Sequence, residues 1–329
     1  MMVENITLGK ALNHGLRRSL EKDAKVVIMG EDVGKLGGVF RITDGLQKDF
    51  GEDRVIDTPL AEAGIVGTAV GLAIRGYRPV CEIQFDGFVF PAYNQIVAQV
   101  AKMFYRSKGY VRLPIVIRIP YGGGIGAVEH HSESPEAYFA HTPGLKVVSC
   151  SNPADAYTMI QQAIASDDPI VFFEPKRRYW EKGEVDLDVD PATAYPLHAA
   201  RVVRPGSDAT LIAYGPMVRT ALDAATAAAE DGRNLEVIDL RSLSPLDMGA
   251  VYDSVRRTGR AVVVHEAPGN LGLGAELAAR ITEECFYSLE APVLRVTGFD
   301  LPYPAARVEE EYLPDLDRVL DAVDRSFGW

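Results

Sequence analysis

Cysteines and basic residues are scarce in this chain of 329 residues. Its three cysteines, Cys81, Cys150 and Cys285, are far apart in apolar surroundings, so no pair is spaced for zinc or redox chemistry. We therefore expect buried free thiols in a reducing compartment. The 34 basic residues face 46 acidic ones, which gives a formal charge of −12. This balance argues against nucleic acid and anionic membranes as partners.

Long apolar runs are also missing. The chain has no stretch of 18 apolar residues, and its first 12 residues contain neither an uninterrupted apolar core nor a cleavage-site pattern. We therefore expect a cytoplasmic protein with no targeting segment and no membrane-spanning helix. With 47% hydrophobic residues the chain can bury a full core, and its length favours two domains.

Short β-rich runs alternate with helical patterns in both halves of the chain. This alternation predicts an α/β fold with two parallel, helix-covered sheets. Strands are expected at 25–29, 79–83, 115–119, 146–149, 170–173, 209–213, 235–238, 261–264 and 293–296, and helices from 59, at 92–104, from 154, at 217–229 and from 275. The acidic stretch 181–196 interrupts the pattern and reads as a linker or a surface hairpin. We predict a first domain at 1–185, a linker at 186–200 and a second domain at 201–329.

The segment 57–71, DTPLAEAGIVGTAVG, places one carboxylate, Glu62, at the start of an apolar helix. Asp57 or Thr58 can cap this helix, and Pro59 suits its first position. As a first-turn acid, Glu62 can simply complement the helix dipole. If its carboxylate is buried, it needs a partner, and a ligand nitrogen is the functional candidate.

Three glycines, Gly64, Gly67 and Gly71, lie in the same helix, which has almost no polar face. Each costs about 1 kcal/mol relative to alanine in a helix interior. Something must therefore pack closely against this helix.

Aromatic residues follow the strand at 79–83. The sequence there contains Gln84 and the phenylalanines Phe85, Phe88 and Phe90. Such a cluster is typical of a core. Ligands bind where parallel strands end, however, so an aromatic at this position can also stack on a flat heterocycle.

A glycine-rich loop, YGGGIGAVEHHSESP, spans residues 121–135. It lacks the Lys-Ser/Thr of a phosphate-binding P-loop, so its glycines indicate backbone freedom. Metal binding by Glu129, His130, His131 and His141 is conceivable, but no paired ligand spacing supports it. The histidines can lie free on the surface, or one of them can enter a pocket for proton transfer.

Distinctive motifs lie along nearly the whole chain. They include MGEDVG at 29–34, GGVFR at 37–41, EIQF at 82–85, HSESPEAYFAHTPGLKVV at 131–148 and FFEPKRRY at 172–179. Together they resemble the beta subunit of the decarboxylating component of 2-oxo acid dehydrogenase complexes. YGPMV and IDLRSLSPLD in the second half resemble a transketolase-type C-terminal domain. The run that starts at His131 looks most like branched-chain 2-oxo acid dehydrogenases, and pyruvate and acetoin enzymes share much of the remainder.

The resemblance implies a transketolase-type pyrimidine-binding domain followed by a transketolase-type C-terminal domain, and thiamine diphosphate chemistry. It implies that Glu62 hydrogen-bonds the aminopyrimidine ring nitrogen of the cofactor. Phe88, with Phe85 and Gln84 nearby, matches the wall of the pyrimidine site. His131 matches the histidine that faces the reacting carbon. The expected reaction is decarboxylation of a 2-oxo acid and transfer of the acyl group to a lipoyl group on a transacylase core.

The magnesium-diphosphate motif GDG of thiamine enzymes is missing. Its only near match, Thr43-Asp44-Gly45, lacks the first glycine. The resemblance therefore implies an alpha subunit that holds magnesium and diphosphate in an α2β2 heterotetramer. The glycine face of the Glu62 helix would lie at a subunit boundary.

Two further sites follow from the resemblance. A potassium ion would be held by backbone carbonyls of Leu113, Ile115, Val116, Ala163, Ser166 and Asp168. A basic domain of the transacylase would dock on acidic residues of the C-terminal region, namely Glu309 to Glu311, Asp315, Asp317 and Asp321. The alternatives are a pyruvate or acetoin dehydrogenase beta subunit with the same mechanism, and a non-catalytic partner that only completes an interface.

Overall fold

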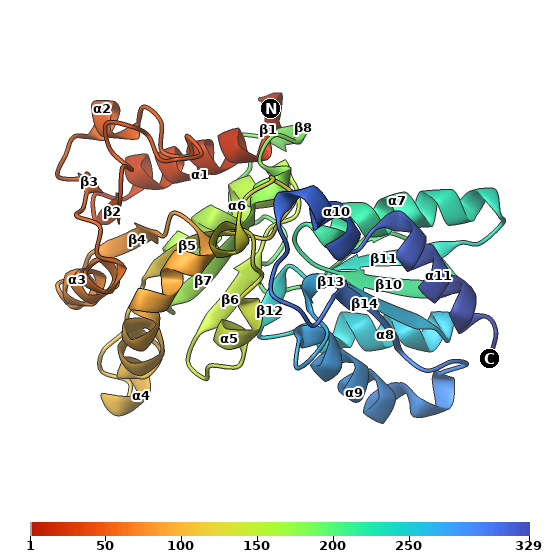
Figure 1. The fold of residues 1–329 in the computed structure, drawn as a ribbon. Coiled ribbons are helices and arrows are strands. Elements are labelled where there is room, and N and C mark those ends of the chain that lie inside the picture. Colours follow the sequence, from red (N-terminus) through yellow and green to blue (C-terminus); the bar gives the residue numbers. More distant parts are fainter. Residues whose placement is uncertain (1) are drawn as a thin grey trace.

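Two helix-covered sheets lie beside one another in the computed structural model, which describes residues 2–329 (Figure 1). The first sheet has the order β12-β6-β7-β5-β4-β2-β3 and the second the order β14-β13-β10-β11-β9. All neighbouring strands are parallel except β12 and β9, which lie at sheet edges and run antiparallel to their neighbours. The predicted two-sheet α/β fold is confirmed.

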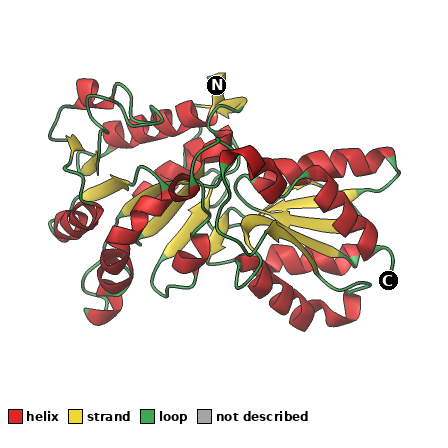
Figure 2. Cartoon of the chain, in the orientation of Figure 1, coloured by secondary structure: helices red, strands yellow, loops and turns green. Residues whose placement is uncertain are grey.

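The elements of the first half surround the first sheet (Figure 2). Its strands are β2 (Val26–Gly30), β3 (Val55–Asp57), β4 (Arg78–Glu82), β5 (Val116–Tyr121), β6 (Lys146–Ser149) and β7 (Ile170–Pro175). Its helices are α1 (Leu8–Lys22), α2 (Leu46–Phe50), α3 (Glu62–Ile74), α4 (Met103–Arg106), α5 (Glu136–Ala140) and α6 (Pro153–Ala165). Central strands β5 and β7 are buried along their whole length, as expected for parallel strands covered on both faces.

The second half repeats this plan. Its strands are β9 (Arg201–Arg204), β10 (Ala209–Ala213), β11 (Leu235–Asp239), β12 (Ser242–Ser244), β13 (Ala261–Pro268) and β14 (Leu294–Gly298). Its helices are α7 (Met217–Glu230), α8 (Met248–Thr258), α9 (Leu273–Cys285), α10 (Glu309–Tyr312) and α11 (Leu316–Ser326). Helices α7 and α11 share one hydrophobic cluster, while α8 and α9 contribute to another on the opposite face.

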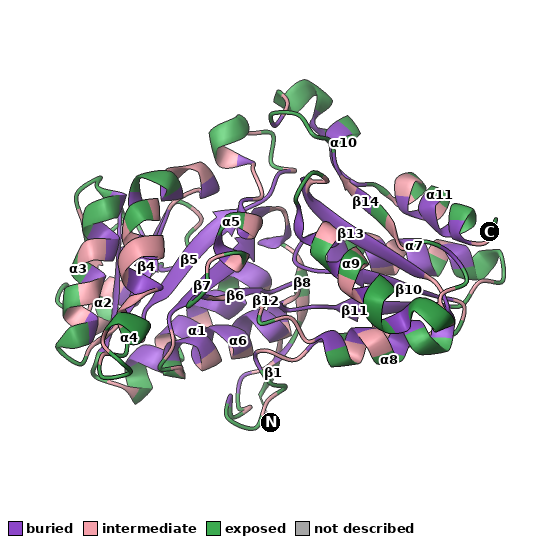
Figure 3. Cartoon of the chain, turned by 90° about the horizontal axis from the view of Figure 1, so that it is seen from below, coloured by how far each residue is buried: buried purple, intermediate pink, exposed green. Residues whose placement is uncertain are grey.

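The halves share one hydrophobic core. A single cluster contains Phe139 and Phe173 of the first half together with Ile212 and Ile238 of the second. The strands run through the purple, buried interior of the molecule in Figure 3. Each half also has a cluster of its own, so the two halves are joined by one shared cluster and the boundary at 186–200 stays a prediction.

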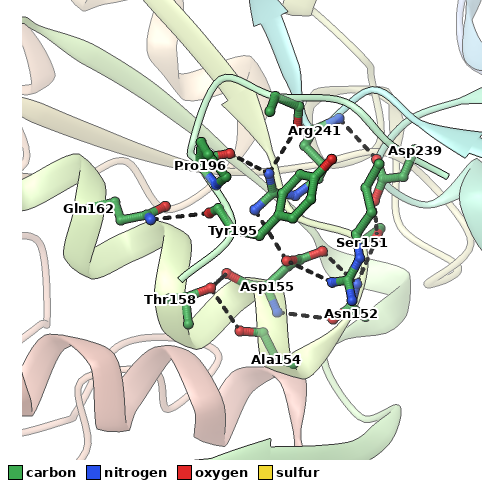
Figure 4. Close-up of polar contacts among 12 residues, drawn as sticks. Ser151, Asn152, Ala154, Asp155, Thr158, Gln162, Tyr195, Pro196, Asp239 and Arg241 are labelled. Atoms are coloured by element: carbon green, nitrogen blue, oxygen red, sulfur yellow. Dashed lines mark hydrogen bonds and ion pairs between the residues drawn. The ribbon is translucent and has the colours of Figure 1, made fainter. Parts of the chain in front are cut away.

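Strand β12 connects the two halves of the chain directly. It belongs to the second half of the sequence but pairs antiparallel with β6 at the edge of the first sheet. Next to it, the buried Arg241 donates to the Pro196 carbonyl over 2.6 Å and contacts Asp155 of α6 at 3.2 Å (Figure 4). Its guanidinium also lies 4.9 Å from the centre of the Tyr195 ring. The linker is thus held against both halves.

Several local predictions were wrong. Helix α3 begins at Glu62 and not at Pro59, and no side chain caps it. Asp57 ends β3, and its carboxylate accepts hydrogen bonds from the backbone amides of Gly34 at 2.6 Å and Lys35 at 3.3 Å. Asp57 therefore binds the backbone of the loop at Gly34 and Lys35 and does not cap the helix.

Two other segments differ from the pattern. The helix expected at 92–104 is divided into a 3-10 turn (Asp86–Ala92), a π-helix (Gln95–Val100) and the short α4. The stretch read as a linker or hairpin contains β8 (Lys182–Asp186), which pairs antiparallel with β1 (Val3–Thr7). Its partner comes from the far end of the chain, which local sequence patterns do not reveal.

All three cysteines are buried and free, as predicted. Within residues 2–329, no helix is both long enough and apolar enough to cross a membrane.

Candidate functional site

The predicted site residues gather at one edge of the first sheet, together with Glu31 and Lys176, which were not predicted from the sequence. Glu31 follows β2, Glu62 opens α3 after β3, and Gln84 follows β4. The loop that carries His131 follows β5, and Lys176 follows β7. These strands are parallel, so their carboxyl ends meet at the same edge, which is where open α/β sheets bind ligands.

Two adjacent carboxylates lack partners at this edge. Glu62 is 7% exposed and has no hydrogen bond or ion pair within residues 2–329. Glu31 is also 7% exposed, and its buried Oε1 has no partner in the same part of the chain. Burial and the nearby charges of Glu62 and Asp32 raise the pKa of Glu31. Buried carboxylates need donors, so this pair marks a place for a ligand that carries N–H groups.

His131 is held between two phenylalanines. Its ring centre lies 4.2 Å from that of Phe85 and 5.1 Å from that of Phe88, both in edge-on geometry. Burial, together with the charges of Lys176 and His130, lowers the pKa of His131. Its Nδ1 is buried without a partner in the described chain, so a neutral imidazole presents an open acceptor or donor there.

The neighbouring His130 behaves differently. It is exposed and lies 3.7 Å from the carboxylate of Glu129. Within residues 2–329, no group of three or more histidine, cysteine, aspartate or glutamate side chains is arranged to hold a metal ion. The interpretation of free surface histidines therefore applies to His130, and it is wrong for His131.

A buried ion pair fixes the loop near His131. Lys176 is 1% exposed, pairs with Asp86 and donates to the His131 carbonyl over 2.6 Å. Asp86 also accepts from the Glu133 amide at 2.8 Å. Burial raises the pKa of Asp86 to about 6 although Lys176 opposes this. The pair of Lys176 and Asp86 was not predicted from the sequence. Its only indication there is a lysine directly after a buried strand.

The other predicted wall residues play distinct roles. Gln84 donates to the Glu31 carbonyl at 3.4 Å and to the Asp32 carboxylate at 3.3 Å, so it joins the ends of β2 and β4. Phe90 lies away from His131 and contacts Tyr138, with ring centres 5.8 Å apart. Of the three phenylalanines, Phe85 and Phe88 belong to the site, while Phe90 is 41% exposed.

A second buried network joins β4, β5 and β7, three of the strands whose ends carry the site. Arg118 of β5 donates to both oxygens of Glu174 at 2.6 and 2.9 Å and to Glu82 at 2.6 Å. Tyr179 adds a hydrogen bond to Glu174 at 2.6 Å. Burial raises the pKa of Glu82, although Arg118 opposes this. Sequence analysis did not single out any of these residues.

The predicted potassium stretches lie side by side. The Ile170 amide donates to the Ile115 carbonyl at 2.9 Å, which brings the start of β5 next to the loop after α6. In this loop the Ser166 carbonyl accepts from the Arg78 guanidinium at 2.9 Å. A carbonyl oxygen has two lone pairs, so a second contact there is possible. Backbone carbonyls are the kind of ligand expected for potassium. At the Ser166 carbonyl, however, the guanidinium of Arg78 already occupies one side of the predicted ligand.

The predicted acidic docking surface needs a correction. Glu309 is only 4% exposed, and its two oxygens accept from the amides of Gly124 and Gly126, both at 2.9 Å. Asp315 caps α11 by accepting from the Arg318 amide at 2.8 Å. Glu309 is thus engaged inside the molecule and is unavailable to a docking partner.

Within this chain, helix α3 is packed on one side only. Ala63, Gly64, Thr68 and Gly71 are exposed, and Ile74 is 54% exposed, so an outer face of α3 remains open (Figure 3). A Cβ atom added at Gly71 would meet no atom within 4 Å. Packing within the chain therefore does not require this glycine.

Two family models match the chain. Residues 4–181 match the transketolase pyrimidine-binding domain, and residues 198–319 match the transketolase C-terminal domain. The two domain types predicted from sequence are thereby confirmed. A split-gene transketolase described as an inactive beta4 tetramer has a TM-score of 0.79 over 99% of both chains, at 22% identity. At that identity the likeness concerns the fold alone.

Relatives of higher identity span almost the whole chain. The pyruvate dehydrogenase E1 component subunit beta of Leifsonia xyli is 63% identical over 99% of this chain and 96% of its own length. The 3-methyl-2-oxobutanoate dehydrogenase subunit beta of Mycobacterium tuberculosis is 53% identical over 98% of this chain and 92% of its own length. The 2-oxoisovalerate dehydrogenase subunit beta of Pseudomonas aeruginosa is 45% identical over 98% and 95%.

Proposed function

Since the chain belongs to the family of beta subunits of 2-oxo acid dehydrogenase E1 components, we propose that Glu62 and His131 are the catalytic residues it contributes. The thiamine diphosphate of this family is shared with an alpha subunit. When bound, the cofactor supplies an electron sink for decarboxylation. The observation that carries the proposal is the buried, unpartnered carboxylate of Glu62 beside Glu31, at the strand ends where ligands bind.

Each side chain has a role that its surroundings support. Glu62 can hold a proton shared with the ring nitrogen of the aminopyrimidine, because no other donor in the described chain competes for its oxygens. Phe88 and Phe85, with Gln84, provide the wall of the pyrimidine site. His131 stays neutral near pH 7 because its pKa is lowered, so its imidazole can take up a proton during acyl transfer to a lipoyl group.

The partner chain is proposed to be an alpha subunit in an α2β2 heterotetramer. In Thr43-Asp44-Gly45, the only near match to the magnesium motif, the first glycine is replaced by Thr43, which is fully buried and donates to the Val33 carbonyl at 2.7 Å. Magnesium and diphosphate would then be held by the alpha subunit. The open face of α3 around Gly64 and Gly71 supports close helix contact with another subunit, since small residues permit such an approach.

Potassium at the carbonyls of 113–116 and 163–168 remains part of the proposal, as does docking of a lipoyl-bearing transacylase core. For the latter, the exposed residues Glu310, Glu311, Asp317 and Asp321 are the remaining candidates on the acidic surface.

The substrate is proposed to be a branched-chain 2-oxo acid, because the run starting at His131 resembles that group. Pyruvate is the competing candidate, and the 63% identity to a protein named for it favours that alternative. Turnover of 3-methyl-2-oxobutanoate and pyruvate by the complex reconstituted with its alpha subunit decides between them. A higher kcat/KM for pyruvate would overturn the branched-chain assignment.

The catalytic role is tested with Glu62→Gln in the same complex. We expect decarboxylation to fall by orders of magnitude, because glutamine cannot hold the shared proton. Glu283→Gln, which neutralises an exposed carboxylate on α9, is the matched control and should leave the rate unchanged. Near-normal decarboxylation by the Glu62 variant would instead support a non-catalytic partner that only completes an interface.

A further inference from the structure

Hydrogen bonds to two carboxylates in the second half of the chain hold the loop that carries His131. We call this set of contacts the grip on the loop. This loop, residues 122–134, leaves the first sheet after β5 and returns at α5. Glu266, near the end of β13, accepts on one oxygen from the Gly123 amide and, at 3.4 Å, from the Ser134 hydroxyl. A single carboxylate oxygen therefore closes the base of the loop.

A second carboxylate holds the outgoing limb of the loop. The two oxygens of Glu309 accept from the amides of Gly124 and Gly126, and Tyr303 supports Glu309 with a hydrogen bond of 2.7 Å. Glu266 and Glu309 are 3% and 4% exposed, so water does not compete for these contacts. Hydrogen bonds between backbone amides and buried carboxylates are stronger than those between neutral groups.

The glycines of the loop are what allow this grip. Gly124 has a φ of +82°, which places its amide toward Glu309. A Cβ at Gly123 would overlap the Tyr303 hydroxyl, since the two would be 1.7 Å apart. The glycine run does bind anions through its backbone, but the anions are two carboxylates of the same chain.

We propose that Glu266 and Glu309 are positioning residues that hold His131 in its place between Phe85 and Phe88. Neither side chain contacts His131, and both act through the backbone of its loop. The contact of Lys176 with the His131 carbonyl fixes the middle of the loop, while these two carboxylates fix its base and one limb. The catalytic relevance of this grip depends on the proposed function of His131, but the grip itself can be measured without it.

The experiment uses the full chain and the variant Glu309→Gln. We expect amide hydrogen exchange in 122–134 to accelerate by about tenfold or more, as loss of a charge-assisted hydrogen bond implies. The imidazole pKa of His131, followed by NMR and assigned with His131→Ala, should rise toward its ordinary value of 6.5 as the ring leaves its half-buried position between Phe85 and Phe88. Glu311→Gln is the matched control, because it removes the same charge from an exposed position two residues away.

Glu266→Gln should give the same two changes, and Tyr303→Phe a smaller one if the Glu266 variant does not fold. Unchanged exchange and an unchanged His131 pKa in Glu309→Gln would overturn the positioning role.

The reconstituted complex then separates this inference from the proposed function. A loosened loop with a lower kcat for acyl transfer and unchanged cofactor affinity supports both. A loosened loop in Glu309→Gln, with kcat unchanged in this variant and in His131→Ala, supports the loop contacts and refutes the catalytic role of His131. An intact loop in Glu309→Gln, with activity lost only in His131→Ala, refutes the grip and upholds the catalytic role.

Discussion

Replacing Arg118 by methionine tests how much the buried network that joins β4, β5 and β7 contributes to stability. The guanidinium is fully buried and makes three charge-assisted hydrogen bonds, two to Glu174 and one to Glu82. Although burial opposes its charge, the carboxylates of Glu174 and Glu82 raise the pKa of Arg118 above its ordinary value. Removing it leaves two carboxylates in the interior without their cation.

Breaking a buried ion pair by removing one partner costs about 3–5 kcal/mol, and we expect a loss in this range near pH 8. The loss of unfolding free energy should be smaller at acidic pH. Burial already raises the pKa of Glu82 above its ordinary value of 4.5, and without Arg118 its pKa rises further. A carboxyl group with a raised pKa destabilises the fold once pH exceeds its pKa in the unfolded chain. The deficit should therefore be smallest below about pH 4.5 and grow as pH rises through the folded-state pKa.

Urea unfolding followed by fluorescence and circular dichroism at several pH values measures this effect. Arg219→Met is the control, since Arg219 forms an exposed pair with Asp223 at 2.9 Å, and such pairs contribute about 0.3–0.5 kcal/mol. Adding Glu82→Gln to the Arg118 variant should restore part of the stability. A loss below about 1 kcal/mol, or one that does not change with pH, would refute the reasoning.

Three further outcomes are expected. Glu62→Gln should stabilise the isolated chain by about 1 kcal/mol, because an amide costs less than a carboxyl group to bury without partners, and a lower thermal midpoint would contradict this. Gly71→Ala should stabilise α3 by about 1 kcal/mol yet weaken assembly with the alpha subunit, and undiminished assembly would show that this face is not a contact. His131→Ala should slow acyl transfer and leave thiamine diphosphate affinity unchanged in a titration of the complex, whereas an equal loss of affinity would indicate a purely structural role.

Local sequence patterns predicted much of the framework. Strands such as β6 and β10 were placed at their observed bounds, because short β-branched runs between turns have few other solutions. The carboxylate of Glu62, for which burial would call for a ligand, is buried. Motif resemblance added His131 and its phenylalanine neighbours, whose contact the structure then revealed.

Long-range contacts were beyond the reach of these patterns. Glu309 lies 185 residues from Gly124 in sequence, and no periodicity links a carboxylate in one half to a glycine loop in the other. The same holds for Arg118 and Glu174, which are 56 residues apart. The start of α3 was misplaced because Asp57 binds a neighbouring loop, a competition that helix-capping preferences alone do not include.

The placement of β12 has a consequence for how the chain folds during synthesis. Until residue 244 has left the ribosome, β6 has no partner on its outer side, and its unpaired backbone groups can recruit strands from other nascent chains. The first sheet is therefore complete only when about three quarters of the protein exists. In a fragment that stops at residue 185, the outer edge of β6 would stay unpaired. This fragment should therefore accumulate as aggregates unless residues 242–244 are supplied in trans.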